Sequence, residues 1–183
     1  YTWFKDSSGN ISSSASDEIT LIINDTTNPS NPTIIANNGD SSTTNTVVTL
    51  ALSATDNVGI TAYYASENNS TPASNASGWN SVTSSASYSG TVSFTLVSTG
   101  SVGTFPRTVY IWFKDAAGNL SGYSSDAINL VVTDTTAPAS PSISINSGAD
   151  NTTSTNVTLT LSATDSEGVT GYYASESSTA PAN

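Results

Sequence analysis

The sequence predicts an all-β chain built from short antiparallel strands. Apolar side chains recur at every second position, clusters of Asn, Asp and Gly at 37–40, 56–59 and 115–119 separate the alternating stretches, and no stretch has helical spacing. A period of two places apolar side chains on one face of a strand, whereas a helix needs a period near 3.6. Because Asn and Asp bond to nearby backbone N–H groups and Gly adopts positive φ, the clusters predict turns.

Seven strands are expected between residues 28 and 136. About seven short strands in a repeat of this length, separated by turns, are the pattern of an immunoglobulin-like antiparallel β-sandwich, whose two sheets bury one face each. In chain order the strands are a short apolar run at 33–36, the alternation Val-Leu-Leu-Ala in 48–54, a short run at 60–64, a weak stretch at 79–82, and the alternations Val-Phe-Leu in 92–96, Val-Ile-Phe in 109–113 and Ile-Leu-Val in 128–132.

The sequence repeats itself at an interval of 109 residues. Residues 1–74 align with 110–183 without a gap, and about 40 of these 74 positions are identical. We therefore predict tandem repeats of about 109 residues in a longer array. The chain would then hold the C-terminal part of one repeat (1–27), a complete repeat (28–136) and the N-terminal part of the next (137–183).

The composition excludes several classes of function. Three Lys and Arg residues against 14 Asp and Glu give a net charge of −11, which is incompatible with binding a run of phosphates on a nucleic acid. The chain has no Cys and no His, so zinc, haem and iron–sulfur sites of the usual kind and Cys or His catalysis are not expected. No apolar run reaches membrane-spanning length. We expect a protein that is not an enzyme.

Three motifs resemble the bacterial immunoglobulin-like tandem repeats of large cell-surface, adhesin or extracellular filament proteins. They are the linker Asp134-Thr-Thr-Ala-Pro138, the strand Leu52-Ser-Ala-Thr-Asp56 and its repeat at 161–165, and the stretch 109–119, Val-Tyr-Ile-Trp-Phe-Lys-Asp-Ala-Ala-Gly-Asn. The resemblance covers the whole chain and implies an extracellular, prokaryotic, non-catalytic role. The expected function is a structural or adhesive segment of a stalk, adhesin or filament. The alternative is a carbohydrate-binding or spacer module array in a large secreted hydrolase.

Carboxylates are expected to gather where a linker enters a repeat. The topology of such a sandwich places Asp25, Asp56 and Asp115 at one end of the complete repeat, and oxygen ligands of this kind suit Ca²⁺. A second group, Asp40, Asp134 and Asp165, is expected at the next junction. Calcium bound at the repeat junctions would stiffen the array. The other interpretation is that Asp56 and Asp115 cap tight turns while Asp25 stays solvated.

Aromatic residues are expected on the outer face of one sheet. If Val109, Ile111 and Phe113 face the core, Tyr110 and Trp112 point outward, and Tyr63 would join them. Such a surface could stack on sugar rings or on another subunit. The other interpretation is that loops of the same repeat or a neighbouring repeat cover these rings.

The expected partners are neighbouring repeats or subunits, including strand exchange between chains, and cell-surface glycans. Nucleic acid and membrane insertion are not expected of this segment. Low charge leaves strand edges with little protection against edge-to-edge association. Eight Asn-x-Ser/Thr triplets would matter in a glycosylating organism: Asn10, Asn24, Asn68, Asn69, Asn75, Asn119, Asn151 and Asn156.

Overall fold

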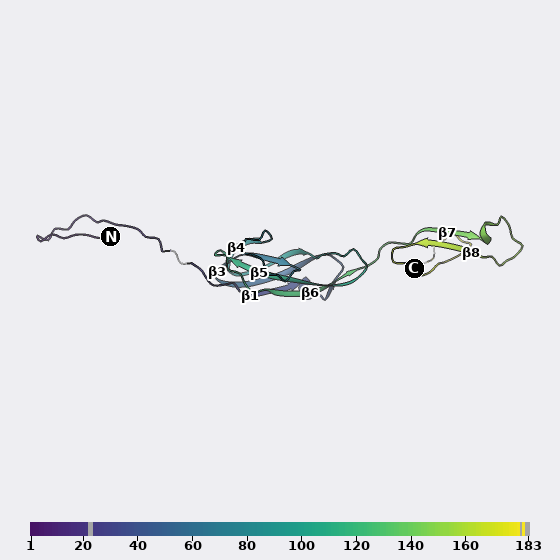
Figure 1. Ribbon diagram of the computed structural model, residues 1–183, viewed down its shortest axis with the longest axis horizontal. Coiled ribbons are helices and arrows are strands. Elements are labelled where there is room, and N and C mark those ends of the chain that lie inside the picture. The colour runs from purple at the N-terminus through teal and green to yellow at the C-terminus, as the bar shows by residue number, and fades with distance from the viewer. Residues whose placement is uncertain (22–23, 180, 182–183) are drawn as a thin grey trace. The chain divides into compact units, whose positions relative to one another are not determined.

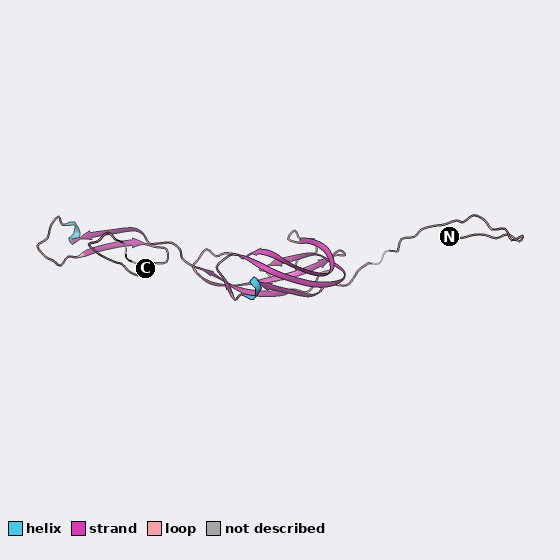
Figure 2. Ribbon diagram, turned by 180° about the vertical axis from the view of Figure 1, so that it is seen from behind, coloured by secondary structure: helices cyan, strands magenta, loops and turns pink. Residues whose placement is uncertain are grey.

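The computed structural model describes residues 1–21, 24–179 and 181, and within them the chain is all-β, as the sequence predicts. Apart from two single turns of 3₁₀ helix, η1 and η2, the regular elements are strands, and no α-helix occurs among the described residues (Figures 1 and 2). The elements are β1 (Ser30–Ala36), η1 (Asn37–Gly39), β2 (Ser42–Thr43), β3 (Val47–Ser66), β4 (Asn80–Thr95), β5 (Gly103–Asp115), β6 (Ser124–Val132), β7 (Ala139–Ile145), η2 (Asn146–Gly148) and β8 (Leu159–Thr164).

The strands form one six-stranded sheet and one two-stranded sheet. The order in the first is β1-β3-β5-β6-β2, with β4 paired to β3, and the second pairs β7 with β8. β3 and β5 run antiparallel with Tyr64 opposite Trp112, whereas β2 and β6 run parallel. β2 was not predicted from the sequence, because it has only two residues and forms by pairing with the distant β6.

Two expected pairs of strands are each a single long strand. The stretches 48–54 and 60–64 both belong to the 20-residue β3, and 79–82 and 92–96 both belong to β4. The expected turn at 56–59 is instead part of the continuous β3, and a bulge follows it, where the register with β5 shifts between Ile60 and Ala62. Asp and Gly support a bulge as readily as a turn, because both need a local backbone distortion.

The described chain divides into two compact units, each with its own buried residues. The first contains Tyr1–Ile35, Ala51–Val92 and Val109–Ser125, and the second contains Ala36–Leu50, Ser93–Thr108 and Asp126–Asn183. Buried apolar side chains of the first unit are Ile34, Leu52, Ala54, Ile60, Ala62, Val109, Ile111, Trp112 and Phe113. Those of the second are Ala36, Val48, Leu50, Leu96, Ile128 and Leu130. Every position that the alternation assigns to the core in 48–54 and 109–113 is therefore buried.

Local conformations recur at the 109-residue interval. The Oδ1 atom of Asn37 accepts the Thr49 N–H at 2.9 Å, and Oδ1 of Asn146 accepts the Thr158 N–H at 2.8 Å. Both Asn residues begin a turn with positive φ, 43° at Asn37 and 46° at Asn146. The same side chain makes the same bond in both copies, so this turn is determined by local sequence.

Burial does not recur with the sequence. Phe113 is fully buried and its counterpart Phe4 is 73 % exposed. Leu52 is 2 % exposed and its counterpart Leu161 is 38 % exposed. Residues 110–130, the counterpart of 1–21 in the repeat, contain parts of β5 and β6. Residues 1–21 instead contain only isolated bridges, Thr2 with Ala15 and Lys5 with Ile11. Identical side chains are therefore buried only where partner strands surround them.

The two tryptophans of the repeated motif give a matched pair for a stability test. We expect Trp112→Ala to lower the free energy of unfolding by about 3–5 kcal/mol, because it leaves a cavity in a packed site. Trp3→Ala, at a residue that is 58 % exposed, should change it by about 0.5 kcal/mol or less. Urea denaturation followed by circular dichroism measures both. Equal effects of the two substitutions would contradict the described burial.

Candidate metal centre

Three carboxylates lie together where the linker meets the middle of β3 and the end of β5. Asp25 precedes β1, Asp56 lies inside β3, and Asp115 is the last residue of β5. One carboxylate oxygen from each lies within 4.8 Å of the other two. The structure thus brings together the first of the two acid groups expected from the sequence.

The backbone of β3 that immediately follows Asp56 positions its carboxylate. Its Oδ2 atom accepts the N–H groups of Val58 at 2.9 Å and Gly59 at 2.7 Å. Gly59 has a φ of 145°, and a Cβ at this position would lie 2.5 Å from Oγ of Ser84. Asp56 is 8 % exposed, and its other oxygen, Oδ1, is buried without a hydrogen-bond partner. One oxygen therefore shapes the backbone while the second remains free for a ligand.

The turn after β5 positions Asp115. Its Oδ1 accepts the backbone N–H of Asn119 at 2.9 Å, and its Oδ2 accepts Nδ2 of the same residue at 2.7 Å. The pair Asp6 and Asn10 makes the same two bonds, both at 2.8 Å, so the motif forms without a surrounding core. Asp115 itself is only 2 % exposed.

Asp25 is held by weaker contacts. Its Oδ1 accepts the Thr27 N–H at 3.0 Å and Nδ2 of Asn57 at 3.2 Å, and its backbone oxygen accepts Nδ2 of Asn119 at 3.2 Å. The hydrogen bonds from Thr27, and then from Asn57, hold the pKa of the Asp25 carboxyl below its usual value. Its Oδ2 is a second buried carboxylate oxygen without a hydrogen-bond partner.

No lysine neutralises this group among the described residues. Lys114 directly precedes Asp115 in β5, but its side chain points elsewhere. Its Nζ donates to the Ser74 backbone oxygen at 2.9 Å and lies 4.7 Å from the ring centre of Trp79. Two carboxylates at this separation repel by about 1 kcal/mol even in bulk water, and by more where solvent is excluded. A hollow of about 570 Å³, lined by Asn24, Asp25, Thr26, Val58, Ala116 and Ala117, adjoins the group.

The second expected group of acids does not form such a cluster within the described residues. Oδ1 of Asp134 accepts the Thr136 N–H at 2.8 Å, and Oδ1 of Asp165 accepts the N–H groups of Glu167 and Gly168. Asp40 is exposed. Each residue thus keeps its local turn without a third carboxylate beside it.

The expectation that Trp112 points into solvent is wrong, because it is 1 % exposed. The ring centres of Tyr64, Tyr110 and Tyr123 lie 6.1, 6.3 and 6.0 Å from that of Trp112. Trp79 extends this cluster through Tyr64, with ring centres 5.6 Å apart. Rings from two strands and two loops therefore cover the face that alternation alone assigned to solvent.

Tyr63 lies on the other face of this strand pair from Trp112. It stands opposite Phe113, while Tyr64 stands opposite Trp112, so the expected companion is displaced by one residue. Tyr63 and Tyr110 are each partly buried, and burial raises the pKa of Tyr63. Tyr64, Trp79 and Tyr123 were not predicted to join this cluster. The one signal in the sequence was the adjacent pair Tyr63 and Tyr64, because one of two successive residues in a strand must lie on the face of Trp112.

The predicted glycosylation positions differ in accessibility. Asn119 is partly buried and its Nδ2 is bonded to Asp115 and Asp25, so the structure engages the atom that would carry a glycan. The other seven, Asn10, Asn24, Asn68, Asn69, Asn75, Asn151 and Asn156, are exposed.

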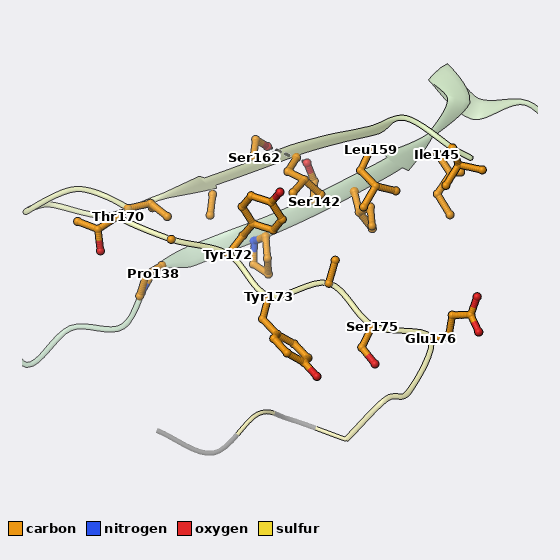
Figure 3. A pocket seen from close by; sticks show the side chains of 18 residues that line it. Pro138, Ser142, Ile145, Leu159, Ser162, Thr170, Tyr172, Tyr173, Ser175 and Glu176 are labelled. Carbon is orange, nitrogen blue, oxygen red and sulfur yellow. Dashed lines mark hydrogen bonds between the residues drawn. The ribbon is translucent and has the colours of Figure 1, made fainter. Parts of the chain in front are cut away.

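A second hollow lies against the two-stranded sheet. Its volume is about 1290 Å³, and its lining includes Ile145, Leu159 and Tyr172 (Figure 3). Tyr172 points toward the strands and Tyr173 away from them (Figure 3). The counterparts of its apolar residues Ile143, Val157 and Leu161 are Ile34, Val48 and Leu52, all buried. The hollow thus follows from side chains of a core type that lack partner strands.

No protein-family model, curated protein or solved structure matches this chain. Within the described residues there is no helix with the length and apolar character needed to cross a membrane. The candidate site therefore has to be judged on its own geometry.

The two Asp–Asn pairs allow the contribution of the linker contact to be measured. Asn119→Ala removes the Nδ2 hydrogen bonds to the buried Asp115 carboxylate and to the backbone oxygen of Asp25, and should lower the free energy of unfolding by about 2 kcal/mol. Asn10→Ala removes only the corresponding Nδ2 bond to the exposed Asp6 and should change it by about 0.5 kcal/mol or less. Urea denaturation curves decide, and similar values for both variants would show that burial adds nothing to this motif.

Proposed function

We propose that the chain is a non-catalytic structural segment of a secreted, prokaryotic array of immunoglobulin-like repeats, forming an extracellular stalk, adhesin or filament. The single observation that carries the proposal is the recurrence of sequence and local bonding at 109 residues. Asp6 and Asp115 bind the following Asn in the same way, and Asn37 and Asn146 each bond to the start of the following strand. Repetition of a self-bonded unit is what an extended array requires.

The packing of strands β1 to β6 supports this role. Apolar side chains contributed by β1, β3, β5 and β6 become buried, and no disulfide is available because the chain contains no Cys. Within each compact unit this burial supplies the principal stabilising free energy. Such a unit can be repeated along a chain without a cofactor or a redox partner.

The structure favours this role over the carbohydrate-binding alternative. A sugar platform needs several rings with open faces, but Trp112 is buried under three tyrosines. Tyr123, which is 56 % exposed, is the most open ring of that cluster. The aromatic cluster therefore stabilises the sheet, and the exposed part of it is a single tyrosine.

The proposal is tested in the native organism with antibodies raised against this chain. We expect labelling of intact cells and electron micrographs in which label follows uniform stalks or filaments. Label on dispersed multidomain particles with hydrolase activity would favour the spacer alternative. Label that appears only after cell lysis would contradict the extracellular assignment altogether.

A further inference from the structure

We propose that Asp25, Asp56 and Asp115 bind one calcium ion, and that the ion fastens linker residues 24–27 to the middle of β3 and the end of β5. The binding site rests on the geometry of these three residues alone. Its mechanical consequence, a stiffer connection into the domain, rests on the proposed structural function. The two claims can therefore fail separately.

The spread of the three carboxylates matches one calcium ion. Calcium–oxygen bonds are about 2.3–2.6 Å long, so two oxygens bound to the same ion lie at most about 5 Å apart. The three ligand oxygens all lie within 4.8 Å of one another. A single ion can therefore contact all three without a change in the backbone.

The unpartnered oxygens supply independent support. Oδ1 of Asp56 is buried and lacks a hydrogen bond, although the residue is 8 % exposed and its Oδ2 is fully engaged. Oδ2 of Asp25 is in the same state. Buried carboxylate oxygens are normally paired, because an unpaired one loses its hydration without compensation. A cation between them compensates both oxygens at once and removes the mutual repulsion.

The remaining coordination positions face the adjoining hollow. Three carboxylates supply fewer than the six to eight oxygens that calcium takes, and water entering through the 570 Å³ space beside Asp25 can supply the others. Magnesium demands near-ideal octahedral geometry and retains its own waters, so a site with three fixed carboxylates favours calcium. With water completing the shell, a Kd on the order of 10⁻⁴ M is expected, as in extracellular calcium modules.

The position of Asp25 determines what the ion does. Asp56 and Asp115 are anchored by short hydrogen bonds in β3 and after β5, whereas Asp25 accepts longer bonds from the amides of Asn57 and Asn119, both at 3.2 Å. A shared cation replaces these weak contacts by a metal–carboxylate bond. Linker order thus becomes dependent on calcium concentration.

The test is calorimetric titration of the whole 183-residue chain with calcium chloride after removal of metal by a chelator. Wild type should bind one ion, and the melting temperature should rise by at least about 5 °C at saturating calcium. Magnesium should bind at least about tenfold more weakly. No binding up to about 5 mM calcium would overturn the proposal.

Two Asp→Asn substitutions provide the matched comparison. D56N should weaken calcium binding at least about tenfold. D165N alters the same residue of the repeated motif, in a turn with the same backbone bonds but no neighbouring carboxylate pair, and should bind as wild type does. Equal affinities for D56N and wild type, or an equal loss in D165N, would overturn the assignment.

A third variant separates binding from folding. In chelator, D25N should retain the wild-type circular dichroism spectrum, because its side chain lies in the linker, and it should still lose calcium affinity. If D56N fails to fold, D25N carries the test, and unchanged affinity in that variant overturns the proposal. The titrations use the isolated chain in solution, so their result does not depend on where the protein is located. Conversely, a negative titration would not change the result of the labelling experiment on intact cells.

Discussion

The antiparallel pairing of β3 with β5 is the constraint on which the rest of the structure depends. Its register places Phe113 in the core, sets Trp112 opposite Tyr64, and ends at Asp115. The bulge of β3 lies beside that end, so the pairing also brings Asp56 to Asp115. A one-residue slip would exchange the two faces and would separate both the aromatic cluster and the acids from their partners.

The acidic cluster is built from local hydrogen-bonding motifs that strand pairing brings together. Asp56 accepts hydrogen bonds from the backbone that follows it in β3, and Asp115 forms its turn with Asn119. The same motifs exist at Asp165, which is partly buried, and at Asp6, which is exposed, but within the described residues neither belongs to a group of three acids. Asp56 and Asp115 become neighbours only because β3 pairs with β5. Their carboxylates then lie close together, and Oδ1 of Asp56 lacks a hydrogen-bond partner.

Much of the fold and of the candidate site could be predicted from the sequence. Every position that period-two alternation assigned to the core in 48–54 and 109–113 is buried, and the predicted turn at 115–119 is present, whereas the turn predicted at 56–59 is part of β3. The alternation could not show that β3 continues through its bulge, because a bulge and a turn use the same residues. It also could not assign Trp112, since a face that is regular in sequence becomes buried only when loops and tyrosines cover it.

Identical residues 109 positions apart, such as Trp3 and Trp112, separate what the sequence determines from what the tertiary structure determines. By itself the sequence determined the 109-residue repetition and the hydrogen bonds that recur with it, because these bonds join residues 4 or 12 positions apart within one segment of the repeat. Tertiary structure decided burial: Trp112 is 1 % exposed and Trp3 is 58 % exposed within almost the same motif. The physical reason is that a turn needs only its own residues, whereas removing an apolar side chain from water needs surfaces supplied by distant strands.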